Sequence, residues 1–133
     1  MPKLTDEQRE FLANPYVGTA TTLRSDGSPH NTVVWVDVDG DTVLFNTAEG
    51  RAKPRHLRRD PRVALTVVDP KDPFRWLSVT GTAELTQDGG AEHIDRLSKK
   101  YTGRDVYANH GPDHPRLKVT ITPERVDATG FVG

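Results

Sequence analysis

The sequence predicts a mainly β protein, an antiparallel barrel of six or seven strands with a few short helices. Runs rich in valine and threonine recur along the chain, and turn signals such as Asp26-Gly27 and Asp39-Gly40 separate them. Strands and helices do not alternate regularly, which disfavours a parallel, doubly wound sheet. The 133 residues contain no internal repeat, low-complexity segment or linker, so we expect residues 1–133 to form one domain.

The first half of the chain begins with a helix and continues with strands. Thr5 and Gln8 stand three residues apart, as in a capping box, and predict a helix over about 6–13. Asn14-Pro15 ends this helix, because the residue before a proline is pushed out of the helical region. The strands expected next are 16–23, 32–38 and 42–46.

The second half is organised around a basic helix expected over about 52–59, where Pro54 is tolerated because it lies in the first turn. Two strands follow, at 63–68 and 75–85, and Gly81 in the longer one predicts a bulge or a close backbone approach. The remaining expected elements are a helix over 91–101, a strand over 117–121, a turn over 122–125 and an edge strand over 126–132.

Composition and charge exclude several classes of function. The chain has no cysteine, which rules out a disulfide, a thiolate nucleophile and cysteine-bound zinc. The net charge of −1 gives no global basic field for nucleic acid, and no apolar run approaches the length of a membrane span. The charged N-terminus does not resemble a signal peptide, so we expect a cytoplasmic protein. The apolar share of 34% is low, which weakly supports a core completed by a second subunit.

The strongest local feature is a basic segment that follows the strand expected at 42–46 and a glycine, Gly50. A helix N-terminus presents unpaired N–H groups and the positive end of a dipole, which predicts a site for an anion such as phosphate. Arg51 and Lys53 are near enough to this N-terminus to bind the same anion. Thr47, at the end of the strand, is a further candidate because its hydroxyl could reach the anion, although the same hydroxyl could instead cap a turn.

The basic helix has two other interpretations. One is a solvated, charged helix, and Arg55, Arg58 and Arg59 are in any case expected to face solvent or carboxylates, because they lie further along the helix. The other is a nucleic-acid patch, which the lack of interleaved aromatic residues and the near-zero net charge disfavour.

Other candidate chemistry is sparse. Trp35 lies within a predicted strand and Trp76 opens one, and each could belong to the core or line a ring-shaped ligand. His110 and His114 are separated by Gly-Pro, so they do not share a helix face as a zinc motif needs, and no metal site is expected. No acid–base pair is visible and the catalytic residues stay unassigned, so any difficult chemistry would belong to a bound cofactor.

Two segments of the sequence resemble a known family. FNTAEGRAKPRHLRRDPRVAL and FRWLSVTGTAEL are similar to the flavin- and deazaflavin-binding split β-barrel family, the pyridoxamine 5′-phosphate oxidase-like group. The likeness runs from about 11 to 126 and is greatest to the actinobacterial branch that uses the deazaflavin F420. Arg-Ala-Lys stands here where the oxidases have Ser-Arg-Lys, and we expect no counterpart of the oxidases' additional C-terminal segment.

The resemblance implies a homodimer with a cofactor site at the subunit interface. Carried over by position, the cofactor-binding residues are Asn31, Val33, Trp35, Thr47, Arg51, Ala52, Lys53, His56 and Trp76. Arg51 and Lys53 would hold the phosphate, with Thr47 and His56 beside them. The residues of the second strand would line the ring and the ribityl chain, and Trp76 would approach from the partner subunit.

The resemblance also implies a function, namely hydride transfer from reduced F420 to an unsaturated small-molecule acceptor. FMN is the alternative cofactor, because it too presents a phosphate and a tricyclic ring. A protein that binds flavin or F420 without turnover is the non-enzymatic alternative, and the missing acid–base pair is compatible with it.

Overall fold

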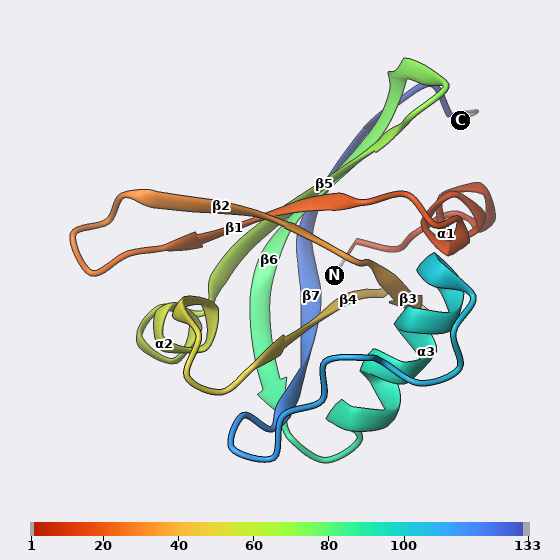
Figure 1. The fold of residues 1–133 in the computed structure, drawn as a ribbon. Helices are drawn as coiled ribbons and strands as arrows, with labels where there is room; N and C mark the ends of the chain where they lie inside the picture. The colour runs from red at the N-terminus through yellow and green to blue at the C-terminus, as the bar shows by residue number, and fades with distance from the viewer. Residues whose placement is uncertain (1, 132–133) are drawn as a thin grey trace.

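Within residues 2–131, which the computed structural model describes, seven strands form one antiparallel sheet with the order β2-β1-β5-β6-β7-β4-β3 (Figure 1). The elements in chain order are α1 (Asp6–Ala13), β1 (Gly18–Leu23), β2 (Pro29–Val34), β3 (Asp37–Asp39), β4 (Thr42–Ala48), α2 (Ala52–Arg59), β5 (Arg62–Asp69), β6 (Asp72–Thr86), α3 (Gly90–Thr102) and β7 (Arg116–Thr129). The predicted antiparallel, mainly β architecture is confirmed. Each predicted helix lies within one residue of its expected bounds.

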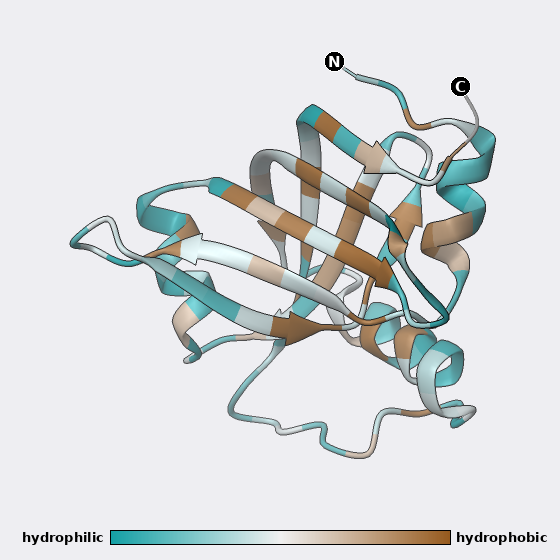
Figure 2. Ribbon diagram, turned by 90° about the horizontal axis from the view of Figure 1, so that it is seen from above, coloured by the Kyte–Doolittle hydropathy of each residue, from teal (hydrophilic) through white to brown (hydrophobic). Residues whose placement is uncertain are grey.

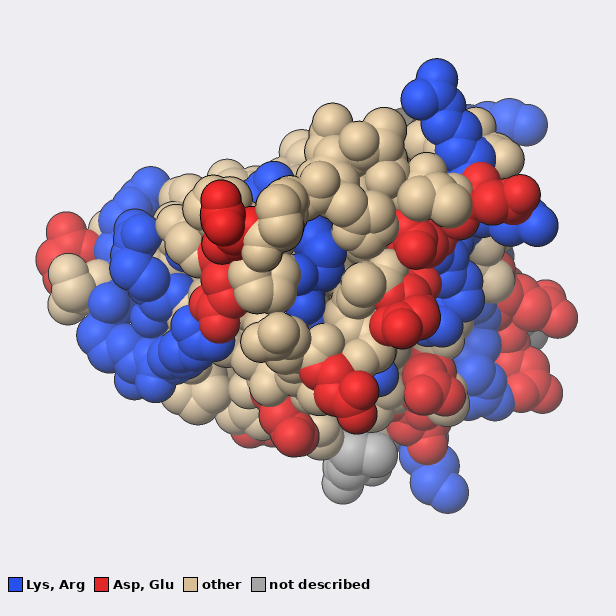
Figure 3. All heavy atoms as spheres, turned by 60° about the horizontal axis from the view of Figure 1, so that its bottom comes forward, with Lys and Arg blue, Asp and Glu red and all other residues tan. Residues whose placement is uncertain are grey.

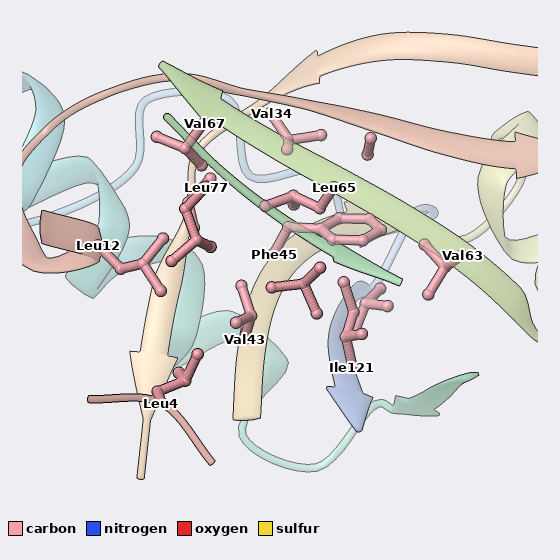
Figure 4. Close-up of a cluster of buried hydrophobic side chains, with 14 of the residues drawn as sticks. Leu4, Leu12, Val34, Val43, Phe45, Val63, Leu65, Val67, Leu77 and Ile121 are labelled. Atoms are coloured by element: carbon pink, nitrogen blue, oxygen red, sulfur yellow. The ribbon is translucent and has the colours of Figure 1, made fainter. Parts of the chain in front are cut away.

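The sheet is strongly coiled (Figure 1), and the side chains of the hydrophobic core lie inside it. Apolar and polar residues alternate along its strands (Figure 2), so that one face of each strand turns inward. Phe45, Leu65, Leu77 and Ile121 are fully buried at the centre of this core (Figure 4). Fully burying a side chain of this size stabilises the fold by about 1.5–3 kcal/mol, so these strands hold the barrel together.

The helices lie at the ends of the sheet. α1 packs beside β3 and begins with the predicted capping box, in which Gln8 N donates to Thr5 Oγ1 (3.1 Å) and Thr5 N donates to Gln8 Oε1 (3.0 Å). α3 packs against β7 and β4, whereas α2 contacts β1 at the other end of the molecule (Figure 1). None of the helices among the described residues is long and apolar enough to cross a bilayer.

The strand predicted over 32–38 is two strands, so this prediction was wrong. β2 ends at Val34 and β3 begins at Asp37. Between them the backbone of Val36 is hydrogen-bonded by side chains of α3. Its N–H donates to the Tyr101 hydroxyl oxygen (2.9 Å), and its carbonyl accepts from Lys100 Nζ (2.5 Å). These side-chain hydrogen bonds replace the backbone hydrogen bonds of a sheet between β2 and β3. The alternation of residues along the strand cannot reveal this break.

The turn predicted over 122–125 is also wrong, because β7 runs without interruption from Arg116 to Thr129. The 15-residue β6 pairs with it along this length. The register shifts between Thr80, which faces Arg125, and Gly81, which faces Pro123. This bulge accommodates the proline, which cannot donate to the ladder. The predicted edge strand is therefore part of β7, and its last expected residue, Val132, lies outside the described residues.

Gly81 sits where the predicted bulge and close approach occur together. A Cβ atom at this position would lie 2.0 Å from the carbonyl oxygen of Thr122. That oxygen belongs to the backbone of the paired strand, so it can move away only if the two strands separate. Glycine is therefore the residue that allows β6 and β7 to pair here.

Gly81→Ala should destabilise the protein by about 1–3 kcal/mol, the usual cost of forcing extra volume into a packed site. Urea denaturation followed by circular dichroism measures this change. Gly111→Ala is the matched control, because an added Cβ meets nothing within 4 Å there. Equal stability of the two variants would contradict the close approach at Gly81.

Candidate functional site

A pocket of about 180 Å³ lies between the end of β2, the N-terminus of α2 and the inner face of α3. Its polar wall is formed by Asn46, Arg51, Lys53 and Arg116. Its apolar wall is formed by Val33, Val34, Trp35, Ile94, Leu97 and Tyr107. The pocket therefore places basic groups beside flat, apolar surface.

The N-terminus of α2 contributes Arg51 and Lys53 to the lining of this pocket. Gly50, with φ +88°, makes the turn that follows β4, and Arg51 is the N-cap residue. No side chain caps the first turn of the helix. Its N–H groups are therefore available, together with the positive end of the helix dipole, for an anion in the pocket.

Two of the pocket cations are held by polar groups that carry no charge. Lys53 Nζ donates to Thr32 Oγ1 (3.0 Å), and Arg116 Nε donates to Asn46 Oδ1 (2.8 Å). Neither cation forms an ion pair with a carboxylate of the described chain. Arg116 is only 7% exposed, and uncompensated charge in such surroundings is costly.

The pKa values of these cations reflect the missing counter-charge. Burial lowers the pKa of Lys53 from its ordinary value, and the positive charges of Arg51 and Arg116 lower it further. Burial likewise lowers the pKa of Arg116. Tyr107 raises this pKa, and the positive charge of Arg51 lowers it further. An anion bound between these groups would relieve both the repulsion and the lost hydration.

The arginines further along α2 are differently engaged, as the sequence predicts. Arg58 makes a two-pronged contact with Glu49, at 2.7 and 2.6 Å. Arg59 donates to the carbonyl of Leu23 (2.8 Å), and Arg55 is exposed. Basic side chains cover this end of the molecule (Figure 3), but these three do not line the pocket.

The apolar wall is built on stacked aromatic rings. Trp35 stacks on Tyr101, with ring centroids 5.3 Å apart and planes inclined by 9°. Tyr107 meets Trp35 edge-on at 6.0 Å. The contact with Tyr101 restricts the orientation of the half-buried Trp35 ring. The apolar wall of the pocket can therefore support a flat ligand.

Four of the residues implied by the resemblance line the pocket: Val33, Trp35, Arg51 and Lys53. The others do not line it in this chain. Asn31 is exposed on β2 and its Oδ1 accepts from Thr21 Oγ1 (2.5 Å). Ala52 is the first residue of α2, and Trp76 pairs with Val68 and Thr129 near the far end of the sheet.

Thr47 and His56 also point away from the pocket. Thr47 follows Asn46 on β4, so its side chain turns to the opposite face, where its buried hydroxyl has no partner among the described residues. His56 is buried beside β1, where its Nδ1 lies 2.8 Å from Thr22 Oγ1 and its ring packs edge-on against His30. His56 anchors the basic helix to the sheet.

The sequence reasoning missed three polar or aromatic residues of the pocket, namely Asn46, Tyr107 and Arg116. Asn46 carries a weak signal, because it is an amide in an otherwise apolar strand. Arg116 alternates with the core residues Leu117 and Val119 and would be taken for solvent-facing. Only the packing of α3 and the following loop buries it. Within residues 2–131 no group of three acidic or histidine side chains is placed to hold a metal ion.

His56, which is buried, and its half-buried neighbour His30 predict a pH dependence of stability. The pKa values of His56 and His30 are both lowered from 6.5, chiefly by burial and then by neighbouring positive charges. Above pH 6.5 the folded and unfolded chains both carry neutral histidines, and the full stability is present. Below this pH the unfolded chain takes up protons that the folded chain does not, so the free energy of unfolding falls.

We expect the free energy of unfolding to fall as the pH is lowered from 7.5 to 5.5, by at most about 1.4 kcal/mol per pH unit for each histidine. His56→Gln should reduce this slope because it removes one of the two groups. Urea denaturation of both proteins across this pH range measures the slopes. Identical slopes would contradict the role given to His56.

Comparison with known proteins shows which family this chain resembles in sequence and fold. Residues 4–130 match the family described as pyridoxamine 5′-phosphate oxidase. The chain is 30% identical over 124 residues to the F420H(2)-dependent biliverdin reductase of Mycobacterium tuberculosis (strain CDC 1551 / Oshkosh), covering 93% of this chain and 87% of that protein. A solved structure described as an F420 reductase superposes with a TM-score of 0.80 at 27% identity, over 93% of this chain and 98% of that one.

A second solved structure, a conserved hypothetical protein of Mycobacterium tuberculosis, superposes with a TM-score of 0.73 at 25% identity, over 95% of this chain and 84% of that one. The family match extends beyond the 11–126 over which the resemblance was seen, at both ends. It includes the basic helix, the bulged β6–β7 pair and all the residues that line the pocket. The chain therefore belongs to the pyridoxamine 5′-phosphate oxidase family and has its split β-barrel fold.

Proposed function

We propose that this protein is an F420-dependent reductase that passes a hydride to an unsaturated small molecule. The observation that carries the proposal is the convergence of Arg51, Lys53 and Arg116 on one pocket without a facing carboxylate, beside the wall of Trp35 and Tyr107. The relatives described as F420-dependent reductases support the choice of cofactor.

The residues present fit a ligand that joins a phosphate to a flat ring. Arg51, Lys53 and the open N-terminus of α2 would hold the phosphate by charge-assisted hydrogen bonds. Val33, which is 70% exposed, and Trp35 would lie against the ring. The chemistry that reduced F420 supplies when bound is hydride transfer.

The chain's own contribution is binding and orientation. No carboxylate or histidine lines the pocket. The two lining groups that could donate a proton, Lys53 and Tyr107, are assigned here to the phosphate and to the aromatic wall. The proton that balances the hydride would come from solvent. Holding the ring and the acceptor in contact would then be the main source of rate enhancement.

A second copy of the chain would complete the site. The pocket volume of about 180 Å³ is below the usual range of about 300–1,000 Å³ for small-molecule sites. Phe74 and Val68 are 78% and 42% exposed near the β5–β6 connection, close in sequence to Trp76. In the proposed homodimer these apolar residues are covered, and the partner subunit provides the missing wall.

Lys53→Ala should weaken F420 binding by about 10- to 100-fold, because it removes one charge-assisted hydrogen bond to the phosphate. Calorimetric titration of the wild-type protein and the variant with F420 and with FMN measures this. Arg125→Gln, which removes an exposed arginine of β7 that is paired with Asp127 and lies outside the pocket lining, is the control and should bind F420 as the wild type does.

The same titrations separate the alternatives. Binding of FMN without F420 would replace the proposal with an FMN-dependent oxidoreductase, and binding of neither would refute it. Turnover is then measured as oxidation of reduced F420 in the presence of conjugated enones. Tight binding without turnover of any acceptor would indicate a carrier protein.

Sedimentation equilibrium should give twice the mass of one chain, and Phe74→Glu should shift the protein toward the monomer because it places a charge in the covered surface. Val106→Glu, at another exposed apolar residue (63%), is the control and should stay dimeric. A monomeric wild-type protein at micromolar concentration would contradict the homodimer.

A further inference from the structure

Arg116 is a cation that the proposed phosphate site does not need. A phosphate group carries at most about two negative charges, which Arg51, Lys53 and the α2 N-terminus can match. Arg116 comes from a different element, β7, and is 7% exposed in the same pocket without an ion pair in the described chain. Keeping such a charge buried is costly unless a ligand compensates it.

A chain of buried hydrogen bonds orients the Arg116 side chain. Its Nε can only donate, so the Asn46 atom 2.8 Å away must be the amide oxygen. The Asn46 amide nitrogen then donates to the carbonyl of Gly90 (3.0 Å) and lies 3.1 Å from His93 Nδ1. Both contacts agree with this orientation of the amide, which is therefore determined by its partners.

The chain continues to a carboxylate on the far side of His93. Because His93 Nδ1 accepts from Asn46, its proton lies on Nε2, which donates to Asp37 Oδ2 (3.1 Å). Arg96 also donates to that oxygen, at 2.9 Å. The negative charge of Asp37 is thus paired away from the pocket, and the relay from Asp37 through His93 and Asn46 orients Arg116 without neutralising it.

An aromatic ring covers the guanidinium group. The Arg116 Cζ atom lies 5.1 Å from the centre of the Tyr107 ring. Tyr107 is itself held in place, because its backbone N–H donates to Asp95 Oδ1 (2.8 Å). With Nε engaged by Asn46 and the Tyr107 side chain against the guanidinium group, the terminal nitrogens of this oriented, planar fork meet no carboxylate in the described chain, and a planar anion can bind them.

We propose that Arg116 is a specificity-determining residue that binds a carboxylate of the acceptor, and that the Asp37–His93–Asn46 relay positions it for this role. The proposal rests on the proposed function, because it treats the pocket as the reductase site. The acceptor class is a flat, conjugated carboxylate, since the fork lies beside the aromatic wall of Trp35 and Tyr107.

The first test uses the cofactor-free protein and does not depend on turnover. trans-Cinnamate, a flat conjugated carboxylate, is titrated calorimetrically, with its uncharged methyl ester as the comparison ligand. We expect cinnamate to bind at least tenfold more tightly than the ester, and Arg116→Gln to abolish this difference by weakening cinnamate alone. Arg125→Gln is the matched control, because Arg125 lies on the same strand, exposed and paired with Asp127 (3.0 Å).

Two further variants test the positioning role. Arg116→Lys keeps the charge but loses the Nε bond and the fork, so it should retain only part of the preference for cinnamate. Asn46→Asp leaves Arg116 in place but sets a negative charge against it, and should remove cinnamate binding as fully as Arg116→Gln does. Thermal unfolding by circular dichroism checks that each variant is folded.

Several outcomes would overturn the proposal. One is cinnamate binding that is unchanged in folded Arg116→Gln or Asn46→Asp protein. Another is a loss of F420 affinity in Arg116→Gln as large as that in Lys53→Ala, with the cinnamate preference intact, since Arg116 would then serve the cofactor. A wild-type protein that binds cinnamate through Arg116 but binds neither F420 nor FMN would retain the carboxylate site while the proposed function fails.

Discussion

The pairing of β6 with β7 is the constraint on which the rest of the structure depends. It runs from Trp76 opposite Thr129 to Thr86 opposite Lys118, and its bulge requires a glycine at position 81. β7 then pairs with β4 on its other side, which brings Arg116 opposite Ala48, just before the turn into α2. The pocket therefore has its polar wall at the point where these two ladders end.

The pocket combines interactions that are unfavourable in the free protein. Cations are partly removed from water, repel one another and meet no carboxylate, and the burial of Arg116 and Lys53 lowers their pKa values. The surrounding core is extensive enough to maintain this arrangement, because the fully buried side chains of the barrel supply most of the stability. A bound anion stabilises such a site because it removes the repulsion between the cations. The free energy gained in this way adds to the affinity of the protein for the anion.

Local patterns predicted the helices and most strands because the interactions that define them are local. The capping box at Thr5 and the proline in the first turn of α2 act within a few residues. Gly81 is a one-residue signal for the bulge, although its partners Thr122 and Pro123 lie on another strand. The errors occurred where partners distant in sequence replaced local bonds. Val36 leaves the sheet because Tyr101 and Lys100 bond its backbone, and β7 passes through a proline because β6 supplies a bulged partner.

The candidate site divides in the same way. The sequence by itself determined the family and the antiparallel barrel, and it predicted that Arg51 and Lys53 lie at a helix N-terminus, because a basic helix start after a strand and a glycine is a local pattern. Only the tertiary structure decided that Thr47 and His56 turn away from the pocket and that Asn46, Tyr107 and Arg116 complete it. Their burial depends on α3 and the loop after it packing over β4 and β7, contacts between residues more than forty positions apart in the chain.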